Sequence, residues 1–453
     1  MVDGTGVGAA DPAVAASRLT ASKLHECLDC GALQILPPMP PRSRAVCLRC
    51  DAVLRHTRQD SFGVCLALNI AALVLFMITG TLTMMSVTAG GQERAATLIT
   101  GPVELEFYGL WELSIVVLIT TFAAPLARTI FMLIVLLGLR LARPPAELRT
   151  IFAWVAHLRP WSMIEIYMLG LFVAYVRLSG MAKIDLGPSV FALVGLMVIL
   201  IAADVALDEQ AVWEAMEPHN RRDRMQERTA AVAHARDTSN RFRIGCDTCG
   251  LVSRSGPGLH CPRCGFRLRV RKPRSIEHAW AFWLAALALY IPANTYPVLT
   301  YVRIGWDEST TILGGVRELV EAQLWPLAAL VFFASFVVPC AKLIGLAFLL
   351  ISTQFGWTWR LHDRTVAYRI IDFIGRWSMI DIFMESILVG LVQFGKIASV
   401  YPGPGAIAFA AVVILTMLSA RSFDPRLMWD NLPARNGAAP VEAPSLMQTE
   451  GRA

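Results

Sequence analysis

The sequence predicts an all-α polytopic membrane protein with two tandem four-helix transmembrane modules, eight spans in total, each module preceded by a small cytoplasmic zinc ribbon. Of its 453 residues, 55% are hydrophobic and only 17% are charged, whereas soluble proteins carry about 25% charged residues. The phrase Trp-Ser-Met-Ile-Glu-Ile at 161–166 recurs as Trp-Ser-Met-Ile-Asp-Ile at 377–382, which is 216 residues later (377 − 161). Eight of the ten cysteines form four Cys-x-x-Cys pairs, a pattern typical of metal sites.

The repeat divides the chain into seven segments. They are a disordered N-terminus (1–22), the first zinc ribbon (23–58), transmembrane module 1 (59–210), a cytoplasmic linker (211–240), the second zinc ribbon (241–274), transmembrane module 2 (275–432) and a disordered tail (433–453). The tail is rich in Ala, Pro, Gly and Glu, a composition that buries too little apolar surface to fold.

Apolar runs of about 20 residues, long enough to cross a bilayer, occur four times in each module. They lie near residues 62–88, 109–139, 151–178, 186–207, 279–302, 322–351, 369–395 and 403–420. Because the number of spans per module is even, both modules should insert in the same orientation, related by an axis along the membrane normal.

Basic residues between the second and third spans of each module predict that these joints face the cytoplasm, by the positive-inside rule. The joints carry Arg140, Arg143, Arg149, Arg159, Arg360, Arg364, Arg369 and Arg376. Four spans return the chain to the side on which it started, so both termini and both ribbons should be cytoplasmic. Since the basic residues lie mostly between apolar runs, the net charge of +6 does not indicate a nucleic-acid partner.

The cysteine pairs predict two structural zinc sites. Zinc in ribbons of this kind is held by four thiolates, which leave the metal no open position for catalysis. A glycine follows Cys30, Cys249 and Cys264, as a tight knuckle with positive φ favours, but Asp51 follows Cys50. The alternative is reduced cysteines without a metal. The predicted ligands are Cys27, Cys30, Cys47, Cys50, Cys246, Cys249, Cys261 and Cys264.

A polar cluster is predicted inside the second module. Lys342 follows Pro339 by three residues. Counted inward from the predicted cytoplasmic ends, Lys342 lies about nine residues deep in its span and Asp381 about eleven residues deep in the next. At 1.5 Å per residue both are roughly 14–16 Å deep, so they can meet at one level. Thr416 should point to a similar layer from the last span. Because a desolvated lysine can lose its proton, this cluster is the predicted proton-coupling site.

The first module has a different pair, Arg128 with Glu165. Arginine keeps its proton at any accessible pH, so we interpret this as a fixed structural ion pair. The alternative, in which the pairs of both modules only hold helices together, stays open because buried ion pairs are often structural.

Three further residues are candidates for the transport pathway. Glu385 lies one turn after Asp381 on the same helix face. Ser378 belongs to the repeated phrase, where helix packing is the alternative role. Asn294 lies between Pro292 and Pro297, and the two prolines predict a broken helix whose backbone lines a cavity.

Four motifs accompany the tandem Cys-x-x-Cys ribbons. They are Ile-Pro-Ala-Asn-x-x-Pro (291–297), Pro-x-x-Lys (339–342), Gly-Arg-Trp-Ser-Met-Ile-Asp-Ile-Phe (375–383) and Ser-Phe-Asp-Pro-Arg-x-x-Trp-Asp (422–430). Together they resemble the paraquat-inducible protein A family over about residues 24–431. The resemblance implies an inner-membrane protein of Gram-negative bacteria that passes phospholipid to or from a periplasmic MCE-domain (mammalian cell entry) tunnel protein, driven by the proton gradient. It also implies that Lys342, Asp381 and Thr416 form the proton-responsive site.

Two other functions compete with lipid transport. A passive membrane anchor for the tunnel protein would leave Lys342 and Asp381 individually dispensable. A membrane thiol oxidoreductase would need its Cys-x-x-Cys pairs at the periplasm or beside a quinone, but every pair maps to the cytoplasmic side. We therefore expect a transporter and no enzyme, and the lack of a phosphate-binding loop motif agrees with a transporter that ATP does not drive.

Overall fold

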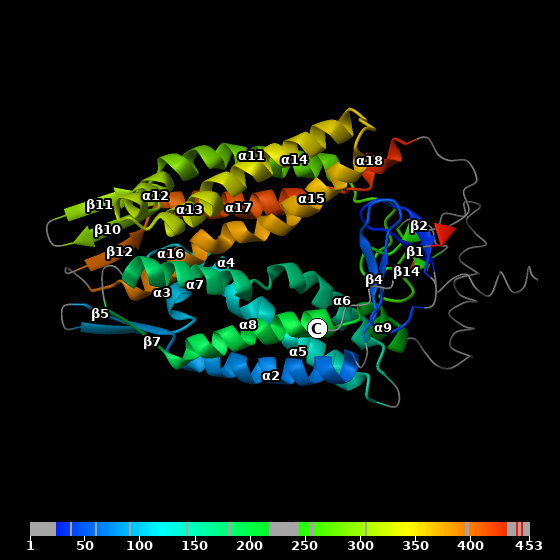
Figure 1. The fold of residues 1–453 in the computed structure, drawn as a ribbon, viewed down its shortest axis with the longest axis horizontal. Coiled ribbons are helices and arrows are strands. Elements are labelled where there is room, and N and C mark those ends of the chain that lie inside the picture. The colour runs from blue at the N-terminus through cyan, green and yellow to red at the C-terminus, as the bar shows by residue number, and fades with distance from the viewer. Residues whose placement is uncertain are drawn as a thin grey trace, which may run out of the picture. The chain divides into compact units, whose positions relative to one another are not determined.

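The computed structural model describes most of the chain between residues 24 and 446 (Figure 1). The described ranges are 24–36, 39–58, 61–89, 92–141, 144–179, 183–216, 244–253, 258–303, 306–394, 398–432, 441–442 and 445–446. The predicted disordered N-terminus and residues 217–240 of the predicted linker lie outside them. The chain forms two units, one of residues 1–59, 208–271 and 432–453, the other of residues 60–207 and 272–431.

In the larger unit, the same order of helices and strands occurs twice along the chain. The first series is α2 (Ser61–Thr81), β5 (Met85–Ala89), β6 (Gln92–Ala96), α3 (Thr100–Phe107), α4 (Trp111–Leu118), η1 (Ile119–Ala123), α5 (Ala124–Gly138), α6 (Glu147–Leu158), η2 (Arg159–Trp161), α7 (Ile164–Ser179), β7 (Lys183–Leu186) and α8 (Pro188–Ala206). The second is α11 (Ser275–Thr295), β10 (Leu299–Arg303), β11 (Trp306–Thr310), α12 (Ile312–Glu321), α13 (Trp325–Phe332), η3 (Phe333–Val337), α14 (Val338–Gln354), α15 (Leu361–Gly375), η4 (Arg376–Met379), α16 (Ile380–Leu391), β12 (Ala398–Pro402) and α17 (Pro404–Ser422), after which comes α18 (Leu427–Asp430).

Seven helical segments of the described chain are long and apolar enough to cross a membrane, so this is a multi-pass membrane protein. They are Ser61–Thr81, Trp111–Gly138, Glu147–Ser179, Pro188–Ala206, Ser275–Thr295, Trp325–Gln354 and Pro404–Asp430. Large apolar side chains such as Met77, Phe191 and Ile344 are exposed on these helices, as expected where lipid tails replace water. The predicted span at 369–395, the seventh in chain order, is not among these seven segments, and η4 divides its region into α15 and α16, of 15 and 12 residues.

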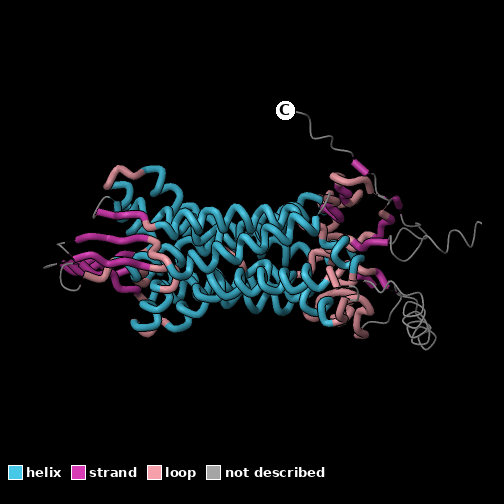
Figure 2. Tube along the Cα trace, turned by 90° about the horizontal axis from the view of Figure 1, so that it is seen from below, coloured by secondary structure: helices cyan, strands magenta, loops and turns pink. Residues whose placement is uncertain are grey.

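Two small antiparallel sheets extend from one end of the helices (Figures 1 and 2). Their strand orders are β6-β5-β7 and β11-β10-β12. The all-α fold class is therefore too narrow, although the described chain is mostly helical. The predicted apolar runs 62–88 and 279–302 include most of β5 and most of β10, because strands that follow closely after an apolar helix do not change the mean hydropathy.

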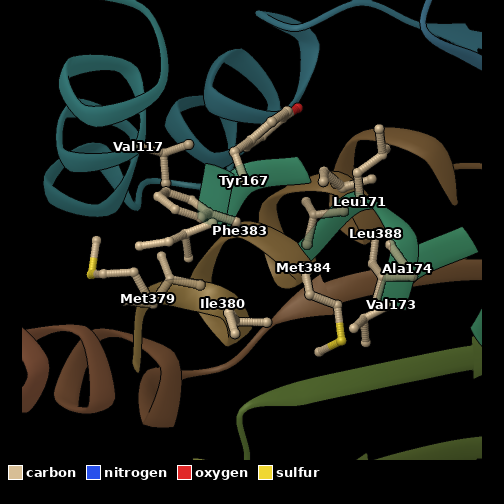
Figure 3. Close-up of a cluster of buried hydrophobic side chains, with 14 of the residues drawn as sticks. Val117, Tyr167, Leu171, Val173, Ala174, Met379, Ile380, Phe383, Met384 and Leu388 are labelled. Atoms are coloured by element: carbon tan, nitrogen blue, oxygen red, sulfur yellow. The ribbon is translucent and has the colours of Figure 1, made fainter. Parts of the chain in front are cut away.

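Helix α16 joins the two halves of the larger unit. It packs on α7 and α3 of the first half, and all its residues are buried. The Tyr167 and Phe383 rings meet edge to face, 5.7 Å between centroids (Figure 3). Glycines allow the close approach: a Cβ on Gly101 would lie 2.5 Å from Ser386 Oγ, and one on Gly390 would lie 3.1 Å from Gly101 Cα. Small residues serve the same purpose in membrane helix interfaces generally.

We expect Gly101→Leu to separate α3 from α16. The added side chain cannot fit, because the nearest obstacles to its Cβ include the backbone oxygen of Ser386 at 2.7 Å, and overpacking of this kind costs about 1–3 kcal/mol or more. The measurement is thermal unfolding of the purified protein in detergent, followed by tryptophan fluorescence. Gly63→Leu is the matched control, since a Cβ there meets nothing within 4 Å; equal melting temperatures for the two variants would contradict the role of Gly101.

Pro292 does not break its helix as the sequence predicts for the second module. Helix α11 runs through Pro292 without a break and ends at Thr295, so the predicted broken helix is wrong. Asn294 Nδ2 donates to the carbonyl of Tyr290 at 2.8 Å, which helps to hold this last turn. Pro339, by contrast, is the second residue of α14 and lies just after a π-helical turn, η3, one of the irregularities that relieve a proline in a membrane helix.

The smaller unit contains the cysteine ribbons. The first has β1 (Leu24–Glu26), β2 (Leu33–Ile35), β3 (Arg44–Val46) and β4 (Val53–His56); the second has β8 (Ile244–Gly245) and β9 (Val252–Ser253); α9 (Glu209–Ala215) belongs to the same unit. Glu26 Oε2 accepts a hydrogen bond from the Gly245 backbone at 2.7 Å, which joins the ribbons. Within the predicted disordered tail, β13 (Val441–Glu442) and β14 (Ser445–Leu446) pair with β2 and β3.

Candidate functional site

Two groups of four cysteines converge in the smaller unit. In each group the four sulfur atoms lie within 4.8 Å of one another, and all eight cysteines are buried. The groups are Cys27, Cys30, Cys47 and Cys50, and Cys246, Cys249, Cys261 and Cys264. They are the quartets that the sequence predicts.

All four knuckles have the same backbone geometry. In the first, Gly31 N–H donates to the Cys27 carbonyl at 2.8 Å, and in the second Asp51 N–H donates to the Cys47 carbonyl at 3.0 Å. Gly31 has φ +70° and Asp51 has φ +56°. Asp51 thus adopts the left-handed conformation that glycine has in the other knuckles, which aspartate tolerates better than most residues.

The sulfur geometry fits a tetrahedral metal ion. Sulfur atoms 2.3 Å from a zinc ion would be separated by about 3.8 Å, and Cys27 and Cys50 Sγ are 3.5 Å apart. Gln34 Nε2 donates to Cys47 Sγ at 2.9 Å, a hydrogen bond that favours the thiolate over the thiol. His25 is not part of either group; burial, together with Arg55 and Arg263, lowers its pKa to about 4, so its ring is neutral at physiological pH.

A cavity of about 340 Å³ lies between the two halves of the larger unit. Five basic and three acidic side chains line it, an excess of two positive charges (5 − 3). We call it the charged cavity, and its charged residues are Arg128, Arg159, Glu165, Asp204, Lys342, Asp372, Arg376 and Arg421. Such a concentration of ionisable groups inside a membrane protein marks a functional site by default.

Asp204 forms ion pairs with two of these arginines. Arg128 Nη2 forms an ion pair with Asp204 Oδ1, and Arg159 Nε lies 4.0 Å from Asp204 Oδ2. The ion pair of Arg128 therefore links α5 to α8, and not to α7 as the sequence predicts. The predicted partner, Glu165, lines the same cavity.

Lys342 is the most deeply buried basic residue of the charged cavity. Only 2% of its surface is exposed, and Nζ donates to the Gly375 carbonyl at 3.4 Å. The acidic residue of its own module in this cavity is Asp372, on α15.

A second, smaller cavity of about 30 Å³ contains two buried carboxylates. We call it the Asp381 cavity, and its polar lining includes Arg177, Ser335, Asp381 and Glu385. Both Asp381 oxygens and Glu385 Oε2 are buried without a hydrogen-bond partner among the described residues. The volume is enough for one or two water molecules, which could solvate these groups.

Arg177 brings a positive charge from the first half of the chain to the Asp381 cavity. Its Nη2 lies 3.5 Å from Glu318 Oε2, and its guanidinium is 5.5 Å from the centre of the Tyr301 ring. Arg177 thus connects α7 to α12 and β10, and also lines the Asp381 cavity.

The structure does not bring the whole predicted Lys-Asp-Thr cluster together. Lys342 lines the charged cavity and Asp381 lines the other one. Thr416 is buried and donates to the Val413 carbonyl at 2.9 Å. Ser378 is buried, and its hydroxyl has no hydrogen-bond partner in the described chain.

Several residues of these cavities were not predicted as site residues. Asp204 carries the same signal as Asp381, a carboxylate inside an apolar run (186–207), and could have been found by it. Arg376 was interpreted only as a marker of topology. Arg177, Asp372 and Arg421 lie near the ends of apolar runs, where charged residues are ordinary, so no sequence signal distinguishes them.

Comparison with known proteins identifies relatives along nearly the whole chain. The family model described as paraquat-inducible protein A matches residues 63–217 and 276–433. Over 91% of this chain and 97% of its own length, the intermembrane transport protein PqiA of Escherichia coli (strain K12) is 31% identical. The lipophilic envelope-spanning tunnel protein A of the same strain is 30% identical over 90% of this chain and 91% of its own length. No solved structure matches.

Proposed function

Since the chain belongs to the paraquat-inducible protein A family, we propose that it is the inner-membrane subunit of an intermembrane phospholipid transport system of a Gram-negative bacterium. In this role it passes lipid to or from a periplasmic MCE-domain tunnel protein. The names of its relatives, which are transport proteins, support this function over an enzymatic one. The observation that carries the proposal is the pair of buried carboxylates, Asp381 and Glu385, without hydrogen-bond partners for three of their four oxygens in the described chain.

Eight spans in two parallel four-span modules are the proposed topology. The repeated order of elements supports it, with α15, η4 and α16 as the seventh span in chain order and α17 as the eighth. Both termini and both ribbons would be cytoplasmic, because the joints between second and third spans are basic. The two small sheets would then lie on the periplasmic side, where the tunnel protein binds.

Proton coupling is proposed to involve Lys342, Asp381 and Thr416 of the second module, with contributions from Glu385 and neighbouring polar residues. A charge in the membrane interior is costly unless it is paired or solvated. A carboxylate without a hydrogen-bond partner therefore favours the conformation in which it is protonated or reaches a partner. Movement of α16 would change both cavities at once, because Asp381 is on α16 and the lining of the charged cavity continues through η4 directly before it.

Ser378 and Asn294 are proposed to offer polar groups to the transport pathway. The Ser378 hydroxyl lies buried in η4 and has no hydrogen-bond partner within the described ranges, so it can accept or donate a hydrogen bond when α16 moves. Asn294 Oδ1 is also buried without a partner in the described residues. Both are polar groups available to water or lipid in another state of the transport cycle.

The metal of the two cysteine groups is proposed to be structural zinc. We expect two zinc ions per wild-type chain and one per Cys261→Ser chain, because each quartet needs all four thiolates to close its coordination shell. The measurement is metal analysis of the purified protein by plasma mass spectrometry. Cys65→Ser is the matched control, since Cys65 belongs to neither group. A Cys261→Ser chain that keeps two zinc ions would contradict this assignment.

A passive anchor for the tunnel protein is the alternative function. It needs no buried ionisable groups, so the unpartnered carboxylates favour transport over it. A thiol oxidoreductase is the weaker alternative, since all eight Cys-x-x-Cys sulfurs are gathered into two closed quartets.

Complementation tests the proposed function. A strain without this chain should lose part of its outer-membrane barrier, measured as sensitivity to detergent, and the wild-type chain should restore it. A photoreactive phospholipid should also crosslink to the chain and to the MCE-domain protein when both are expressed. A strain with an intact barrier and no crosslink would refute lipid transport.

A further inference from the structure

Three basic side chains of the charged cavity have no close counter-ion. Lys342, Arg376 and Arg421 line the cavity, and among the described residues none of them has a carboxylate oxygen within 4.0 Å. The Arg376 guanidinium contacts the Phe373 ring, 5.7 Å from its centre, and its N–H groups have no hydrogen-bond acceptor among the described residues. Glu165, Asp204 and Asp372 offset only three of the five positive charges that line the cavity, so the cavity favours a further, negatively charged group.

The shape and size of the cavity indicate which anion completes it. A guanidinium presents its donors in a planar fork that matches two oxygens of a phosphate. The volume of about 340 Å³ is far more than one water molecule or a single ion requires, and it lies in the range of sites for small organic molecules. A phosphate with an attached organic group therefore fits better than a simple anion.

The cavity is open to its surroundings. The Arg159 side chain on its rim is 50% exposed, and Asp372 is exposed. Next to these residues, a row of apolar side chains, Ile370, Phe373 and Trp377, is exposed at helical spacing along α15 and η4. An apolar row of this kind beside a polar opening suits a molecule with a charged head and acyl chains.

We propose that the charged cavity binds the phosphate of a phospholipid headgroup, with Arg376 and Arg421 as the phosphate ligands and the acyl chains along the exposed row of α15. This inference deepens the proposed function and rests on it for the source of the phosphate, which is a membrane lipid. Lys342 adds a third positive charge from α14. At this position a lipid headgroup would bind between the two halves of the larger unit, as a first step of transport.

Direct binding to the full-length protein in dodecyl maltoside tests the site. The probes are dihexanoyl-phosphatidylethanolamine, phosphate-free dihexanoylglycerol and sodium phosphate, followed by microscale thermophoresis. We expect Arg376→Gln and Arg421→Gln each to weaken binding of the phospholipid about tenfold, because each removes a charged donor pair. The diacylglycerol should bind much more weakly than the phospholipid to the wild-type chain. Arg360→Gln is the control, since Arg360 is exposed and outside the cavity.

Ile371→Trp provides a second variant that keeps every charge. Ile371 lines the cavity, so an indole ring should fill it and abolish phospholipid binding even if an arginine variant fails to fold. Unchanged binding in Arg376→Gln, Arg421→Gln and Ile371→Trp would overturn the site. Sodium phosphate that competes with the lipid and binds as tightly would overturn the membrane lipid as the source of the phosphate. Because the assay measures binding alone, its result is independent of whether the protein transports lipid in cells.

Discussion

Asp381→Asn should abolish the ability of the chain to restore the outer-membrane barrier, while the amount of protein in the membrane stays the same. Asp381 is 6% exposed, and neither of its carboxylate oxygens has a hydrogen-bond partner in the described chain. Asparagine keeps the shape and the burial but cannot gain or lose a proton. A transport cycle that depends on protonation should therefore stop in one state, with complementation reduced to the level of the empty vector.

The controls for this prediction separate chemistry from folding. Asp363→Asn changes an exposed aspartate outside both cavities and should complement normally. Equal immunoblot signals in membrane fractions would show that Asp381→Asn folds and inserts. Full complementation by Asp381→Asn would sink the proton-coupled mechanism and favour the passive anchor, and Lys342→Met should then be silent as well.

The two cysteine groups could be predicted almost completely from the sequence. Spacing alone assigns all eight residues, because a knuckle is a local structure in which Cys-x-x-Cys fixes both sulfurs. Even the exception, Asp51 in place of a glycine, keeps the positive φ that the pattern requires. Local geometry of this kind needs no knowledge of the rest of the fold.

The sequence singled out Lys342 and Asp381 as charged residues inside the membrane, but it could not predict which residues they contact. Counting residues from the ends of the spans estimates the depth of Lys342 and Asp381, but it gives no direction around the helix axis. The structure places η4 between α15 and α16, which changes the direction that Asp381 faces. Lys342 donates to the Gly375 carbonyl at the end of α15, while Asp381 lines another cavity with Glu385.

The ion-pair partner of Arg128 also could not be predicted from the sequence. The repeat suggested Glu165 because the corresponding residue, Asp381, is acidic, whereas the pair that forms uses Asp204 of α8. Position 420, which is 216 residues after Asp204, is alanine. A comparison of the two halves therefore cannot identify a partner that only one half contains, and contacts between helices have to be known.

The motif Ser-Phe-Asp-Pro-Arg at 422–426 gains a structural explanation. Arg426 and Asp424 are 2% and 1% exposed, and Arg426 Nε lies 3.0 Å from Asp424 Oδ1. Asp424 Oδ2 also accepts from the Lys272 backbone at 3.0 Å, and the Asp424 backbone N–H donates to Ser275 Oγ at 2.8 Å. The pair thus connects the end of α17 to the start of α11.

Arg426→Ala should be the most destabilising single change in this region. Removal of one partner leaves a buried carboxylate with backbone donors alone, which costs about 3–5 kcal/mol for buried pairs. Chemical unfolding of the purified protein in mixed micelles measures the free energy of unfolding. In the control Arg360→Ala, an exposed pair with Asp363 is lost, and the cost should be about 0–1 kcal/mol. The double variant Asp424→Asn/Arg426→Met removes both charges and should recover much of the stability, because the penalty comes from the uncompensated charge; a double variant less stable than Arg426→Ala would contradict this account.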